Sequence, residues 1–62
     1  MEPLKFKGWL AANGITNDEV AEVINVSRTT ANYKINGKKQ FTIKEAKILS
    51  GHFGISINDY FL

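Results

Sequence analysis

The sequence predicts an all-α fold of five short helices in one compact domain. Two observations lead to this prediction. Helix start signals recur along the chain, with a threonine followed three residues later by a glutamate at Thr16 and Glu19 and again at Thr42 and Glu45. This is the pattern of a capping box. After these signals apolar residues recur at helical spacing, and we expect no strands.

The first two expected helices are bounded by residues that favour helix ends. Pro3 suits the first turn of a helix that we expect to reach Ala12, where Asn13-Gly14 is a typical stop. The second helix begins at Thr16, and the acidic residues of its first turn suit the positive end of the helix dipole. Its apolar face is expected to hold Val20, Ala21 and Ile24.

The remaining three helices are predicted in the same way. Ser27 caps a third helix that reaches about Ile35. Thr42 opens a fourth that Gly54 ends, and Ser56 starts a short fifth helix. The aromatic side chains expected in the core rather than at a stacking surface are Trp9, Phe41 and Phe53.

The second and third helices form the most informative pair. Only a few residues separate them, and Asn25 tolerates the left-handed backbone that a tight turn requires. This spacing predicts a helix-turn-helix. An αα-hairpin in any small helical bundle gives the same pattern, so the spacing alone leaves both interpretations open.

Composition limits the possible classes of function. The chain has 62 residues, 44% of them apolar, and no cysteine, so we expect one domain over residues 1–62 with no disulfide or thiolate metal site. Met1 is expected to be a natural start. No segment is long and apolar enough to span a membrane, and we expect a cytoplasmic protein. His52 is the only histidine, so the sequence predicts no metal, no cofactor, no small-molecule ligand and no enzymatic activity.

Positive charge is concentrated in one part of the chain. The net charge is +2, yet residues 28–47 carry six basic residues and one acid, a net +5. A basic segment on a nearly neutral protein suggests a face that binds a polyanion. A solvated lysine-rich surface would give the same charge distribution, so charge alone does not decide between them.

Two longer stretches resemble a known family. The segments "TNDEVAEVINVSRTTANYKINGKK" and "FTIKEAKILSGHFGISINDYF" are similar to the lambda-repressor-like helix-turn-helix proteins of the Cro, cI and Xre type, closest to small phage repressors and Cro-like proteins. The resemblance covers about residues 4–61. It implies a five-helix domain that binds double-stranded DNA, usually as a homodimer on a palindromic operator.

The resemblance also implies roles for individual residues. It places Ala21 at the tight crossing of the second and third helices. Two positions differ from the family pattern, because Asn25 stands where glycine is usual and Lys34 where an apolar residue is usual. We expect Ile35 to take over that packing, and the Lys34 stem to follow the core edge with its amine in solvent. The buried positions are expected to be Val20, Ile24, Val26 and Ala31.

The start of the third helix carries side chains that are suited to reading bases. Arginine offers a fork to guanine O6 and N7, asparagine can pair with adenine, and a threonine methyl can contact thymine. Arg28, Asn32 and Thr29 supply these three chemistries within about one and a half turns. The residues expected to contact bases are Ser27, Arg28, Thr29 and Asn32. For Thr29 a phosphate contact is an equal alternative, and for Ser27 the alternatives are a cap alone or a phosphate contact.

A second group of side chains is expected to contact the DNA backbone. Polar and basic side chains near a reading helix commonly bind phosphates, which fixes the register of the protein on the duplex. For Tyr33, packing of the ring on the following loop is an equal alternative. The residues expected to contact phosphates are Asn17, Thr30, Tyr33, Lys38 and Lys39.

These observations favour a sequence-specific transcriptional regulator, expected to be a Cro-like repressor of a phage or prophage. The alternative is a helix-turn-helix module that binds a protein, as an antirepressor or an antitoxin-like partner, since fold alone does not fix function. The basic segment over residues 28–47 argues against the alternative without excluding it.

Overall fold

Five helices make up the computed structural model, which describes residues 3–61. No strand occurs within these residues, so the predicted all-α class is confirmed. The helices are α1 (Pro3–Ala12), α2 (Asn17–Ile24), α3 (Arg28–Ile35), α4 (Ile43–Phe53) and α5 (Ile57–Tyr60).

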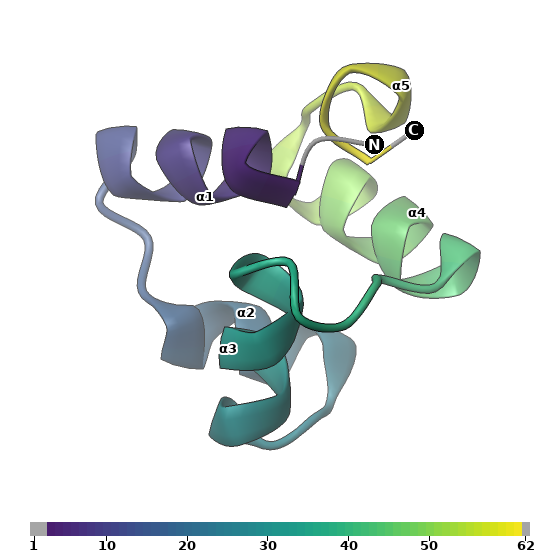
Figure 1. Cartoon of the computed structure of the whole chain (residues 1–62). Helices are drawn as coiled ribbons and strands as arrows, with labels where there is room; N and C mark the ends of the chain where they lie inside the picture. Colours follow the sequence, from purple (N-terminus) through teal and green to yellow (C-terminus); the bar gives the residue numbers. More distant parts are fainter. Residues whose placement is uncertain (1–2, 62) are drawn as a thin grey trace.

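The helices pack so that α3 lies at one side of the molecule (Figure 1). In this view α2 and α3 lie together below, while α1, α4 and α5 lie above them. Helix α2 packs against both α3 and α4, α1 packs against α3 and α5, and α4 contacts α5. Helix α3 therefore packs on α1 and α2 with one face, and its opposite face points outward.

An aromatic cluster around Phe6 forms the centre of the core. The Phe6 ring is fully buried. It lies 4.8 Å from the ring of Phe61 and 5.7 Å from that of Phe41, the latter in an edge-to-face arrangement. Trp9 and Phe53 pack at the margin of this cluster and are partly buried. Edge-to-face and offset pairs of this kind are favourable beyond the area they bury, and the core role expected of the three aromatic residues is confirmed.

Side-chain caps begin four of the helices, as the sequence predicts. Thr16, Ser27, Thr42 and Ser56 each accept a hydrogen bond from the backbone N–H three residues later. Each cap satisfies a donor that a helix leaves unpaired at its start. Among the described residues, Thr42 with Glu45 forms the full capping box, whereas the structure shows only the threonine half at Thr16.

Asn25 produces the tight turn between α2 and α3. Its φ and ψ angles are 58° and 51°, in the left-handed region, and it is the single described residue other than glycine with a positive φ. The next residue, Val26, donates its backbone N–H to the carbonyl of Ala21 at 3.0 Å. Two hydrogen-bonded residues therefore reverse the chain and bring α3 against α2, as a helix-turn-helix requires.

The left-handed Asn25 leads to a prediction for stability. The Cβ of any L residue in this conformation comes close to the following carbonyl, and asparagine tolerates the clash because its short polar side chain can hydrogen-bond locally. Alanine has the same Cβ without that polar group, so Asn25→Ala should destabilise the fold by about 1 kcal/mol. Glycine has no such clash, and Asn25→Gly should leave the free energy of unfolding unchanged or raise it slightly. Urea unfolding of the three proteins measures the difference, and equal stabilities for the alanine and glycine variants would contradict the prediction.

Candidate nucleic-acid interface

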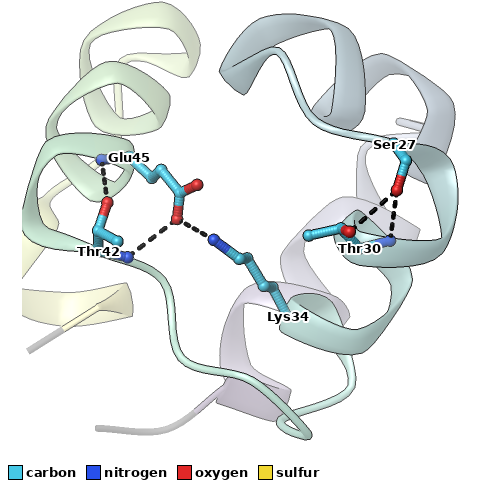
Figure 2. Close-up of polar contacts among 5 residues, drawn as sticks. All are labelled: Ser27, Thr30, Lys34, Thr42 and Glu45. Carbon is cyan, nitrogen blue, oxygen red and sulfur yellow. Dashed lines mark hydrogen bonds and ion pairs between the residues drawn. The ribbon is translucent and has the colours of Figure 1, made fainter.

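The first turn of α3 is fixed by paired hydroxyl groups. Ser27 Oγ accepts a hydrogen bond from the backbone N–H of Thr30 at 3.1 Å and donates one to Thr30 Oγ1 at 2.9 Å (Figure 2). Ser27 is exposed and Thr30 is half-buried. The pair holds the N-terminus of α3 in a defined conformation while its outer surface stays open to solvent.

Arg28, the first residue of α3, forms an ion pair with α2. Its Nε lies 3.0 Å from Asp18 Oδ1, although both side chains stay largely exposed at 75% and 60%. Because the contact uses Nε, the two terminal Nη groups remain available to another acceptor. The turn at Asn25 brings these two residues together although they lie ten positions apart.

A second contact joins the same two helices one turn further along α3. Asn17 Nδ2 donates to Asn32 Oδ1 at 2.6 Å. This contact and the ion pair lie in an open hollow of about 290 Å³ between the starts of the two helices. The hollow is lined by Thr16, Asn17, Asp18, Arg28 and Asn32.

The other end of α3 leads into a basic loop. The backbone N–H groups of Lys38 and Lys39 both donate to the carbonyl of Tyr33, at 2.8 and 3.2 Å. The Lys38 amine lies 6.0 Å from the centre of the Tyr33 ring, within the range of a cation–π contact. Two exposed lysines and a half-exposed tyrosine therefore share one surface at the C-terminal end of the helix.

Lys34 anchors the inner face of α3. We expected its amine to lie in solvent, and this expectation is wrong. The side chain is only 10% exposed, and Nζ donates to Glu45 Oε1 of α4 at 2.5 Å (Figure 2). Ile35, beside it, is buried at 1% exposure, as predicted. A buried amine without a partner would be costly, and the Glu45 carboxylate supplies that partner.

Glu45 serves two roles in this contact. Its Oε1 also accepts the backbone N–H of Thr42 at 2.9 Å and so completes the capping box of α4. Burial raises the pKa of the Glu45 carboxyl, but the hydrogen bonds from Lys34 and from the Thr42 N–H outweigh burial and leave this pKa below its ordinary value. One carboxylate thus joins the inner face of α3 to the start of α4.

The structure separates the nine predicted site residues into two groups along α3. Arg28 and Asn32 lie in the hollow with Asn17, while Ser27 and Thr30 form the cap beside it. Tyr33, Lys38 and Lys39 lie together at the far end. Thr29 belongs to the first group by its position, because it follows Arg28 on α3, and it is exposed.

Asp18 is a site residue that the sequence did not reveal. As an acid in the first turn of α2 it was explained by the helix dipole alone. The one sequence signal for its ion pair with Arg28 was the predicted turn, which brings the starts of the two helices together.

Within residues 3–61 no group of three or more histidine or acidic side chains is arranged to hold a metal ion. No helix in this part of the chain is long and apolar enough to cross a membrane.

The fold and this surface define a helix-turn-helix protein, in which α2 supports an α3 that presents polar and basic side chains outward. A family model described as Helix-turn-helix matches residues 7–60. The chain therefore belongs to this helix-turn-helix family, of the Xre- and cI-like kind, whose members are DNA-binding regulators. No curated protein and no solved structure gave a significant match to the chain.

The buried ion pair leads to a prediction for stability at neutral and acid pH. Lys34→Met keeps most of the stem but leaves the part-buried Glu45 carboxylate without its amine, which should cost about 1–3 kcal/mol at pH 7. The lowered pKa of Glu45 means that the pair stabilises the fold above the ordinary value of 4.5 and that this contribution is lost as the pH falls through the folded pKa. The difference between wild type and variant should therefore shrink below pH 4.5.

Urea unfolding at pH 7 and at pH 3 measures both effects. Lys44→Met is a matched control, because Lys44 is an exposed lysine of α4 and its replacement should change stability little at either pH. A penalty for Lys34→Met that is the same at both pH values would argue against the ion pair as its cause.

Proposed function

We propose that this protein is a sequence-specific transcriptional repressor of the Cro-like type, encoded by a phage or prophage and acting in the cytoplasm of its bacterial host. It binds a palindromic operator as a homodimer and inserts α3 into the major groove. The observation that carries the proposal is the outer face of α3. There the fold leaves the side chains of Arg28, Thr29 and Asn32 free of the core and holds two of them from α2.

The N-terminal half of α3 is proposed to read bases. Arg28 and Asn32 are four residues apart and so lie on one face of the helix. A major groove about 12 Å wide accepts a helix, and its base edges offer distinct donors and acceptors. Arg28 is assigned to a guanine and Asn32 to an adenine. Thr29 is assigned to a thymine methyl, and Ser27 to the edge of the groove.

The flanks of α3 are proposed to bind phosphates. Lys38 and Lys39 lie in a loop whose backbone is hydrogen-bonded to the carbonyl of Tyr33. Both side chains therefore extend from a fixed backbone position. At the other flank, Asn17 begins α2, at the positive end of the helix dipole, which favours an anion. The residues assigned to phosphates are Asn17, Thr30, Tyr33, Lys38 and Lys39.

The small size of the reading surface supports the proposed homodimer. Helix α3 has eight residues and is about 12 Å long, so one copy reaches only a few base pairs. Two copies related by a two-fold axis double the contacts, and their half-sites lie about 34 Å apart, one turn of the duplex.

The proposal predicts a specific result for selection from random DNA. Wild type and Arg28→Ala are each bound to a pool of random duplexes, and the retained DNA is sequenced. Wild type should enrich a palindrome, and Arg28→Ala should lose the preference at one symmetric pair of positions, at a cost of about 1–3 kcal/mol per contact. If neither protein enriches any sequence at low salt, the DNA-reading proposal fails and a protein partner becomes the better explanation.

A phosphate contact gives a different result. Lys39→Ala should weaken binding about equally for all sequences and reduce the slope of log affinity against log salt by about 0.9. Lys5→Ala is the matched control, because Lys5 lies on α1 with its amine 5.6 Å from the ring of Tyr60 of α5. Titrations at several salt concentrations measure both slopes, and an unchanged slope for Lys39→Ala would remove Lys39 from the interface.

A further inference from the structure

The ion pair between Asp18 and Arg28 is not explained by folding. Both side chains are mostly exposed, at 60% and 75%, and exposed pairs of this kind contribute little to stability. The pair places a carboxylate beside the residue best suited to read a guanine, on a surface otherwise suited to bind phosphates. A carboxylate in that position repels the phosphates of any DNA. Its presence therefore needs another reason, and its contact with Arg28 is the one that the structure offers.

The geometry of the contact provides that explanation. Asp18 forms an ion pair with Arg28, and its Oδ1 oxygen lies 3.0 Å from Nε. The guanidinium is planar and its donors are fixed relative to one another, so a carboxylate held beside Nε restricts the directions that the two Nη groups take. Those two groups are sufficient for a bidentate contact with guanine O6 and N7. An arginine held in this way loses less freedom on binding than a free one.

We propose that Asp18 is a positioning residue for sequence recognition, which orients Arg28 toward a guanine and at the same time weakens binding to other DNA. This inference rests on the proposed function. The two effects have opposite signs in affinity. Orientation strengthens binding to the correct site, whereas the negative charge weakens binding to phosphates at every site.

The test compares Asp18→Ala with Glu19→Ala. Both changes remove one carboxylate from the first turn of α2, so they have the same effect on the helix dipole and on net charge. Glu19 follows Asp18 in the chain and is exposed, and it forms no ion pair with Arg28. Binding is measured at fixed salt to the palindrome that wild type selects, to the same duplex with the Arg28 guanine replaced, and to unrelated DNA.

The expected result separates the two variants. Both should bind unrelated DNA more tightly than wild type. Only Asp18→Ala should reduce the preference for the guanine, by about three- to tenfold, a part of the discrimination that a bidentate arginine supplies. In an Arg28→Ala background, Asp18→Ala should reduce the preference no further, because the residue that Asp18 orients is absent. Asp18→Asn, which keeps the shape of the side chain, should give an intermediate loss.

Two results would overturn the inference. The first is a guanine preference that survives Asp18→Ala but is lost in Arg28→Ala, which would leave Arg28 as a reader that needs no support. The second is equal loss of preference in Asp18→Ala and Glu19→Ala, which would show an effect of charge alone. In both cases the proposed function would stand, whereas a wild type that selects no sequence would overturn both proposals together.

Discussion

The contact between Lys34 and Glu45 determines how the rest of the interface is presented. A lysine amine buried without a partner costs several kcal/mol, so α3 packs at low energy only in the rotation that brings Lys34 Nζ to the Glu45 carboxylate. At about 100° per residue, Asn32 then lies about 160° from Lys34 around the helix and faces outward. The same carboxylate caps α4, so the rotation of α3 and the start of α4 are fixed together.

Helix α2 acts on the outer face of α3 as Glu45 acts on its inner face. The first two residues after the Thr16 cap make these contacts. Asn17 contacts Asn32, and Asp18 contacts Arg28. These contacts depend on the left-handed Asn25, which reverses the chain within two residues and brings the starts of the helices together. The turn therefore has consequences beyond connecting two helices, because it determines which side chains of α2 can orient those of α3.

Most of the fold could be predicted from the sequence because helix ends are local. A cap at Ser27 or Thr42 needs only a side-chain oxygen and the N–H three residues later, and both helices begin where these residues predict. Lys34 could not be placed in this way. Its spacing from Ala31 predicts the core and its charge predicts the surface, and only Glu45, eleven residues later, decides between them. The contact of Asp18 with Arg28 was missed for the same reason, since it exists only after the turn has formed.

The hydrogen bonds at the two ends of α3 favour a rigid interface over one that forms on binding. At its start, Ser27 is bonded to Thr30 and Arg28 is held from α2. At its end, the Tyr33 carbonyl accepts two N–H groups of the loop that carries the lysines. A helix of eight residues is only marginally stable by itself, so these contacts supply order that DNA would otherwise have to provide. Order that exists before binding lowers the entropic cost of association. The proposed reading of bases by a surface this small depends on that lower entropic cost.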